Sequence, residues 1–293
     1  YTPLFYAEVD NSAANTTTDS MQALLIGPML TSGTATASEV TYVSSAEQAA
    51  KLFGEGSLLH RMVKAYRDQD GSGTLYCLPL ADPGSGVAAT KTVTFTGSAT
   101  EAGTINLYVG FELVQTAVAS GETASDVAGH VMASINARTD LPVTASAAEG
   151  TLTLTAKHKG LVSEDFAVNL NLLGATNGQV FPAGVSAVVA DGKAGTGVPD
   201  IEEAFEALKD EPFEFIGLLY SDKTSLDASK AAMTKRWAYD VQLYGHVYTA
   251  KRDSVENLLD IGDTQNDEHL TCFAVSETDP NIAADRLGAA VGQ

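Results

Sequence analysis

The fold class is clearest in residues 199–250, which read PDIEEAFEALKDEPFEFIGLLYSDKTSLDASKAAMTKRWAYDVQLYGHVYTA. Asp200 and Glu203 form a capping box at the start of a helix, and Pro212 ends that helix. Residues 213–220 are almost continuously apolar. This pattern is typical of a strand that is buried on both faces, and such strands belong to parallel sheets covered by helices.

The remainder of this stretch repeats the alternation. A second helix begins at Thr224 or Ser225, and a second strand runs from Tyr244 to Thr249. The apolar side of the helix consists of Leu226, Met233 and Trp237. Helices and strands that alternate in this way predict a doubly wound α/β layer.

Elements of the same kind lie on both sides of this stretch. Further strands are predicted at 23–29, 74–80 and 270–275, and further helices after Ser44 or Ser45, after Ser57, and after Asp253 or Ser254. The last of these helices carries Val255, Leu258 and Leu259 on one face. The predicted fold is therefore α/β, with a doubly wound mixed sheet whose core is discontinuous in sequence, formed by residues 21–86 and 196–293.

Residues 87–195 have a different pattern, in which apolar and polar residues alternate with a period of two. Strands are predicted at 91–95, 105–109, 113–118, 143–145, 151–155 and 166–172. Gly110-Phe111 fits a two-residue type II′ turn, Glu149-Gly150 a second turn, and Thr123 with Asp126 the start of a helix. Stretches rich in Gly and Ala flank the block on both sides. We therefore expect an inserted, β-rich α+β domain at 87–195.

Residues 1–20 are predicted to be an extended N-terminal arm. Four apolar side chains, Leu4, Phe5, Tyr6 and Val9, precede a run of Asn, Ser and Thr. Such an arm must dock, either on its own domain or on a neighbouring subunit. The chain begins at Tyr1 rather than Met, which suggests a trimmed product.

Composition excludes several classes of partner. The chain has 37 acidic and 17 basic residues, a formal charge of −20. This balance argues against nucleic acid, because binding to its backbone requires clustered Lys and Arg, and against anionic membrane surfaces. No apolar run approaches the roughly 20 residues that span a membrane. Cys77 and Cys272 lie in apolar strands and are interpreted as buried thiols.

The sequence offers few candidates for a catalytic or cofactor site. No G-x-G-x-x-G motif follows a predicted strand, there is no P-loop, and there is no G-x-S-x-G nucleophile elbow. The strongest enzyme-like features are His246 and the run Asn266-Asp267-Glu268-His269, which lie near predicted strand ends, where doubly wound folds place their sites.

Metal binding is also disfavoured by the spacing of potential ligands. Asp263, Asp267 and His269 match no zinc or calcium pattern. The basic cluster Lys157-His158-Lys159-Gly160 is interpreted first as an exposed strand end, with an internal or intersubunit charge pair as the alternative. We therefore predict no catalytic residue, no cofactor and no metal.

Several segments together resemble the tail sheath proteins of Mu-like contractile phages. They include LLIGPM, LFGEGSLLHRMVKAYRDQD, LYCLPLAD, TVTFTGSATEAGTINLYVG, ASDVAGHVMASINARTDLPVTA, GTLTLTAKHKG, DEPFEFIGLLY, YGHVYTA and the ND-x-H segment at Asn266, Asp267 and His269. The resemblance covers essentially the whole chain in order. It is this order, rather than any single segment, that is specific.

The resemblance implies a structural protein of the virion, assembled in the host cytoplasm. Such subunits form stacked hexameric rings around the tail tube and contract to drive it through the host envelope. The implied partners are copies of the chain, the tail tube protein, and the baseplate and tail terminator proteins. Arms such as the one with Leu4, Phe5, Tyr6 and Val9 link neighbouring subunits in this family. Because family members continue beyond the position of Gln293, we expect the chain to be a fragment.

Two other classes of function stay open. A surface receptor-binding module would require the insert to carry a concave, aromatic-lined site, for which Tyr108, Phe111 and Phe166 are the available residues. An enzyme on the doubly wound core would require a ligand or metal beside His246 and His269.

Overall fold

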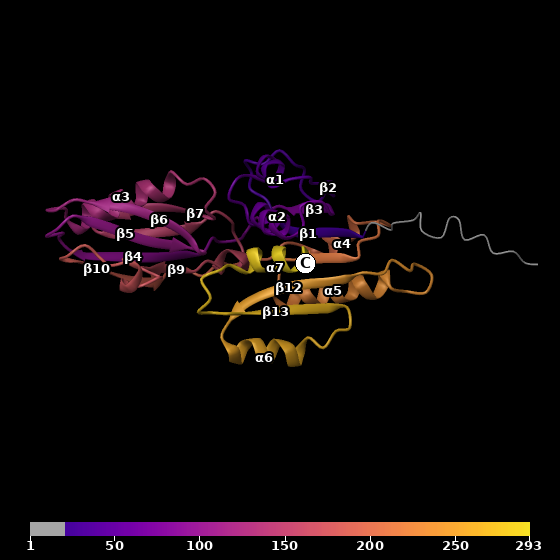
Figure 1. The fold of residues 1–293 in the computed structure, drawn as a ribbon. Coiled ribbons are helices and arrows are strands. Elements are labelled where there is room, and N and C mark those ends of the chain that lie inside the picture. Colours follow the sequence, from indigo (N-terminus) through magenta and orange to yellow (C-terminus); the bar gives the residue numbers. More distant parts are fainter. Residues whose placement is uncertain (1–20) are drawn as a thin grey trace, which may run out of the picture.

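The computed structural model describes residues 21–293. The predicted arm with Leu4, Phe5, Tyr6 and Val9 lies outside the described residues. Figure 1 shows an elongated molecule, with a sheet covered by helices at one end and the β-rich residues of the predicted insert at the other.

The larger sheet is mixed and mostly parallel, as predicted. Its strand order is β13-β12-β11-β1-β3-β2, and only the edge strand β2 runs antiparallel to its neighbour. The strands are β1 (Gln22–Pro28), β2 (Thr41–Tyr42), β3 (Thr74–Leu80), β11 (Phe215–Leu218), β12 (His246–Asp253) and β13 (Leu270–Ser276). Chain segments separated by the predicted insert are therefore neighbours in one sheet.

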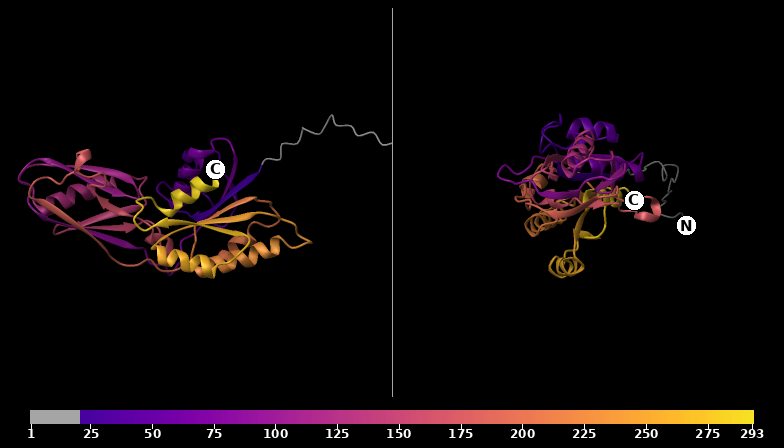
Figure 2. Two further views of the ribbon diagram at one scale, coloured as in Figure 1. Left: turned by 60° about the horizontal axis from the view of Figure 1, so that its bottom comes forward. Right: turned by 90° about the vertical axis from the view of Figure 1, so that its left-hand side faces the viewer.

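Helices cover both faces of this sheet, which confirms the doubly wound prediction (Figure 2). On β1, Ala23 and Leu25 pack in one apolar cluster with α1, α2 and α7, whereas Leu24 and Ile26 pack in a second cluster with α4 and α5. The helices are α1 (Ala46–Phe53), α2 (Leu58–Gln69), α4 (Ile201–Glu206), α5 (Lys223–Arg236), α6 (Val255–Thr264) and α7 (Ala283–Val291).

Four of the predicted helix starts are confirmed. Ser45, Ser57, Asp200 and Ser254 are the N-caps of α1, α2, α4 and α6, and each accepts a hydrogen bond from a backbone N–H of the first turn.

The predicted start of α5 at Thr224 or Ser225 is wrong. Asp222 is the cap, because its carboxylate accepts hydrogen bonds from both the backbone nitrogen and the hydroxyl of Ser225, at 3.1 and 2.6 Å. The prediction of the apolar side of α5 is also only partly correct. Leu226 and Met233 are buried, but Trp237 lies beyond the last turn and is 41% exposed.

Residues 90–191 form two antiparallel sheets around α3 (Ala124–Asn136). One has the order β10-β4-β8-β7 and the other β6-β5-β9. The strands are β4 (Thr90–Gly97), β5 (Gly103–Val109), β6 (Glu112–Val118), β7 (Val143–Ala148), β8 (Thr151–Ala156), β9 (Val168–Leu170) and β10 (Val185–Asp191). Val127, Val131 and Ile135 are the buried face of α3, as predicted from their spacing.

The turn between β5 and β6 is not the predicted type II′. Gly110 and Phe111 have φ values of 56° and 70°, whereas a type II′ turn has a positive φ only at its first central residue. Two positive values are typical of type I′, which also matches the twist of the strands. Glu149 and Gly150, at 48° and 81°, form the predicted second turn between β7 and β8.

Three elements were not predicted: β2, β10 and α7. Ile282, Leu287 and Val291 lie near helical spacing in a segment rich in Ala and Gly, and α7 packs closely on α2. Gly288 permits this approach, because a Cβ there would overlap the backbone carbonyl of Met62.

The chain enters and leaves residues 87–195 at one place. Val87 and Thr196 exchange two backbone hydrogen bonds of 3.0 and 3.1 Å. We propose that residues 87–195 are a self-standing domain and that 21–86 and 196–293 are the core, because a short bridge can then replace the insert with little strain.

Deleting residues 87–194 and joining the ends with a short Gly/Ser linker is expected to leave a core that unfolds cooperatively, at a lower temperature than the intact chain. The decrease is expected because contacts from His158 and Asp165 to the core are lost. Differential scanning calorimetry is the measurement. A variant without a cooperative transition would show that the insert and the core are one domain.

Candidate functional site

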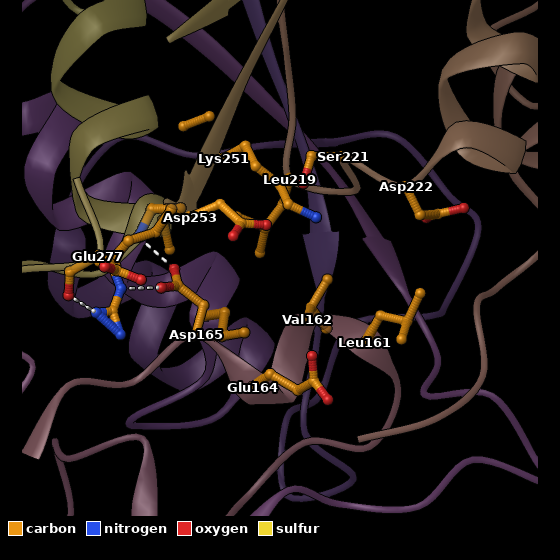
Figure 3. A pocket seen from close by; sticks show the side chains of 15 residues that line it. Leu161, Val162, Glu164, Asp165, Leu219, Ser221, Asp222, Lys251, Asp253 and Glu277 are labelled. Atoms are coloured by element: carbon orange, nitrogen blue, oxygen red, sulfur yellow. Dashed lines mark hydrogen bonds and ion pairs between the residues drawn. The ribbon is translucent and has the colours of Figure 1, made fainter. Parts of the chain in front are cut away.

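A pocket of about 330 Å³ lies at the carboxyl edge of the large sheet (Figure 3). From β1 the sheet extends to β3 on one side and to β11 on the other, so the strand order reverses at β1. Doubly wound proteins bind ligands outside the carboxyl ends of strands at such a reversal. The pocket combines Leu219 after β11, Lys251 on β12, Ala283 on α7, and residues 161–165 of the predicted insert. It is therefore the candidate site that the fold itself defines.

Asp165 links the predicted insert to the core at this pocket. Its Oδ1 accepts a hydrogen bond from Nε of Arg252 at 2.9 Å, and its Oδ2 accepts one from the backbone nitrogen of Ala283. The N-cap residue of α7, Ile282, offers no side-chain acceptor, so Asp165 caps α7 from 118 residues away in sequence. Burial raises the pKa of Asp165 to about 6, although the Ala283 N–H and the charge of Arg252 act in the opposite direction.

Three other carboxylates of the pocket are also held by backbone groups. Glu164 accepts a hydrogen bond from the Gly195 nitrogen at 3.0 Å, Asp222 from Ser225 at 3.1 Å, and Asp253 from Ser254 at 2.8 Å. A carboxylate bound in this way fixes a loop or a helix start. The arrangement therefore supports a structural role rather than acid–base catalysis. A polar contact that holds together chain segments distant in sequence is called a joint below.

His158 forms a second joint between the predicted insert and the core. It is 1% exposed, and its Nε2 accepts a hydrogen bond from the backbone nitrogen of Leu58 at 3.1 Å. Its Nδ1 lies 2.9 Å from Oδ1 of Asp82, to which it donates, while Oδ2 of Asp82 accepts from the Lys159 nitrogen at 2.9 Å. The expectation of an exposed strand end at Lys157-His158-Lys159-Gly160 is wrong for His158, which is buried. The alternative was a charge pair; the observed contact is internal, and in it a neutral imidazole donates a hydrogen bond to the Asp82 carboxylate.

A buried ion pair forms the third joint. Arg61 on α2 donates two hydrogen bonds to Asp285 on α7, at 3.0 and 2.6 Å, and the side chains are 8% and 22% exposed. The same guanidinium lies 3.5 Å from the carbonyl oxygen of Gly110 in the β5–β6 turn. Burial raises the pKa of Asp285, and the charge of Arg61 opposes this increase. The first turn of α7 is thus connected to the predicted insert and to α2.

The sequence placed His246 and His269 near strand ends, but at the wrong edge of the sheet for a site. His246 begins β12 and His269 precedes β13, so both lie at the amino ends of parallel strands. Nε2 of His246 lies 2.8 Å from the Thr271 hydroxyl, and burial lowers the pKa of His246. The ring of His269 packs 4.7 Å from that of Trp237. These contacts are those of packed side chains.

Within residues 21–293, no group of three or more His, Cys, Asp or Glu side chains is arranged to hold a metal ion. Asp263 lies on α6, and Asp267 accepts a hydrogen bond from the His269 nitrogen at 3.1 Å. Cys77 is a buried free thiol, as predicted, and Cys272 is a half-buried one. Burial raises the pKa of both thiols.

The raised pKa of Asp165 predicts a dependence of stability on pH. Because its pKa increases from 3.8 to about 6 on folding, the folded chain binds this proton more tightly. Its contribution is fully present below pH 3.8 and is lost as the pH rises through about 6. The free energy of unfolding of the wild type relative to D165N should therefore fall by about 2.4 kcal/mol between pH 4 and pH 7. Urea unfolding at several pH values measures this difference.

D140N provides a control of opposite sign. A hydrogen bond from the Arg138 side chain, more than any other cause, lowers the pKa of Asp140. The stability of the wild type relative to D140N should therefore rise with pH over the acidic range. Parallel profiles for D165N and D140N would contradict the assignment of the pH effect to Asp165.

The fold is α/β, and residues 90–191 form two antiparallel sheets between the two parts of the chain that build the mostly parallel sheet. No family model matches the chain. The chain is 36% identical over 274 residues to the Mu-like prophage FluMu tail sheath protein of Haemophilus influenzae, a match that covers 93% of this chain and 56% of that protein. The chain is a homologue of the tail sheath proteins of Mu-like prophages, and it spans about half the length of this relative.

Two solved structures were also matched. The sheath tail protein of Desulfitobacterium hafniense aligns with 100% of this chain and 61% of its own, at a TM-score of 0.40 and 11% identity. That of Listeria innocua aligns with 96% of this chain and 58% of its own, at a TM-score of 0.36 and 13% identity. In the described part of the chain, none of the helices is both long and apolar enough to cross a membrane.

Proposed function

We propose that this chain is a subunit of the sheath of a contractile phage tail, a component of the virion that assembles in the host cytoplasm. It polymerises with its own copies in stacked hexameric rings around the tail tube, adjoins the baseplate and tail terminator proteins, and contracts to drive the tube through the host envelope. The observation that carries the proposal is the 36% identity to a Mu-like prophage tail sheath protein along 93% of the chain.

The geometry of the core supports a structural role. A subunit that transmits force needs its segments joined by directional contacts. The carboxylates of Asp165, Asp285 and Asp82 supply such contacts across segments distant in sequence. One of these carboxylates, Asp165, lines the pocket of about 330 Å³ at the carboxyl edge of the sheet.

The receptor-binding alternative requires aromatic side chains gathered on the surface of the insert. Tyr108 and Phe166 are 4% and 2% exposed, so they belong to the interior of this region, whereas Phe111 is 53% exposed. Nothing in this arrangement favours that alternative over the sheath.

Electron microscopy of the protein at its full encoded length tests the proposal. We expect tubular polymers with hexameric rings when it is expressed with its tail tube protein. Particles that stay monomeric at every concentration, with or without the tube protein, would contradict it.

A further inference from the structure

A groove of about 250 Å³ runs between α4 and α5 on the outer surface of the core. Alanines of α5 form its floor: Ala228, Ala231 and Ala232. Three basic side chains and three acidic ones form its rim: Lys209, Lys235, Arg236, Glu202, Glu206 and Asp210. In a chain with a formal charge of −20, a groove with no net charge is a comparatively positive surface.

Arg236 gives this groove an unsatisfied cation. The residue is 7% exposed, and its two terminal nitrogens donate to the backbone carbonyls of Lys209 and Glu211, at 2.9 and 2.5 Å. Its Nε is buried and has no hydrogen-bond partner among residues 21–293, and no carboxylate there forms an ion pair with it. No carboxylate pairs with this guanidinium among the described residues, so its charge adds to the positive potential that Lys209 and Lys235 create at the groove.

Helix α6 has the complementary surface. None of its residues is buried, and Val255 and Leu259, four positions apart, are 68% and 66% exposed. An acidic stripe runs beside them: Glu256, Asp260 and Asp263. Figure 1 shows α6 below β13 at the margin of the core, and Figure 2 shows it on the same side of the sheet as α5. A helix with an apolar ridge and one sign of charge is suited to a groove of another molecule.

We propose that α6 of one copy of this chain docks in the α4–α5 groove of a second copy. Val255 and Leu259 lie on the alanine floor, and the acidic stripe of α6 faces Lys209 and Lys235, whose attraction the unpaired charge of Arg236 strengthens. The proposal rests on the proposed function, because it names the surfaces through which sheath subunits meet.

The contact is heterologous, since the groove and α6 are different parts of the surface. Each subunit therefore has one of each, and the contact repeats from subunit to subunit. A repeated head-to-tail contact generates a closed ring or an open helix, so it can supply either the contact within a ring or the contact between stacked rings.

Cross-linking between differently substituted copies tests the contact. All variants carry Cys272→Ser, and Cys77 stays because it is buried. One population carries Leu259→Cys on α6 and the other Ala231→Cys in the groove, both in the protein at its full encoded length. After co-assembly and treatment with a short bis-maleimide, we expect a product of twice the chain mass. Neither population alone should give this cross-linked product. A mixture of Leu259→Cys with Ala194→Cys, a substitution of an exposed alanine of the insert, should not give it either.

Charge reversal provides an independent measurement. Lys235→Glu and Asp260→Lys should each raise the critical concentration for polymerisation about tenfold, because each places like charges together in every contact. The double variant should return towards the wild-type value. Lys193→Glu, which makes the same charge change on an exposed residue of the insert, should leave it unchanged.

The outcomes separate this inference from the proposed function. Polymers that form normally without the Leu259→Cys to Ala231→Cys product would overturn the inference and leave the sheath assignment intact. The same holds if each single charge reversal weakens assembly and the double variant weakens it further. Protein that forms no polymers at all contradicts both proposals.

Discussion

Replacing Asp285 with alanine is expected to lower the free energy of unfolding by about 3–5 kcal/mol. The substitution leaves Arg61 with a side chain that is 8% exposed and without the two hydrogen bonds of its ion pair. Removing one partner of a buried pair costs more than the pair itself contributes, because the remaining charge stays desolvated. Chemical denaturation at neutral pH gives the value directly.

The double variant R61M/D285L is the matched control. It removes both charges and fills the site with apolar side chains, so much of the stability lost in D285A should be recovered. If R61M/D285L is at least as unstable as D285A, then packing around Arg61 rather than its unpaired charge is responsible.

Replacing Leu218 with alanine is expected to cost about 2–5 kcal/mol. Leu218 is fully buried on β11, in the middle of the six-stranded sheet, and packs in the cluster beneath α4 and α5. A cavity there lies between a strand and two helices that cannot collapse without moving the sheet. Thermal and urea unfolding are the measurements.

Leu173→Ala removes the same atoms from a side chain that is 51% exposed, and it should change stability by no more than about 0.5 kcal/mol. Equal effects at Leu218 and Leu173 would show that the central position of β11 has been misjudged.

Local patterns predicted the elements whose signals lie within a few residues. The apolar run around β11 and the caps at Ser45, Ser57 and Ser254 were sufficient, because a capping oxygen and the backbone N–H that donates to it are only three residues apart. Leu218 and Leu219, adjacent in this apolar run, pack in different clusters, as expected where side chains alternate between the faces of a sheet.

The joints of the candidate site could not be predicted from such patterns. His158 binds Leu58 from 100 residues away, Asp165 binds Ala283 from 118, and Arg61 binds Asp285 from 224. From the sequence alone, each of these polar residues would be interpreted as a solvent-exposed side chain. Only the folded chain brings them together.

Helix α6 shows a different limit of the sequence pattern. Val255, Leu258 and Leu259 have the spacing of an apolar face, yet Val255 and Leu259 are 68% and 66% exposed. Periodicity identifies the apolar face of a helix, but it does not show whether that face is buried by the same chain or by another molecule. By contrast, β10 and α7 were not predicted, although Val185, Val189, Leu287 and Val291 provide apolar side chains in these segments.

The order of folding follows from the way α2 and α7 begin. The first backbone N–H of each helix is bound by a residue of the segment between 87 and 195, His158 in one case and Asp165 in the other. These contacts close loops of about a hundred residues, and long loops form late and slowly. We therefore expect the first turns of both helices to be the last parts of the core to gain protection against hydrogen exchange. In a folding chain whose strands are already paired, the first turns of α2 and α7 would then still be unprotected, and both lie on the same face of the sheet.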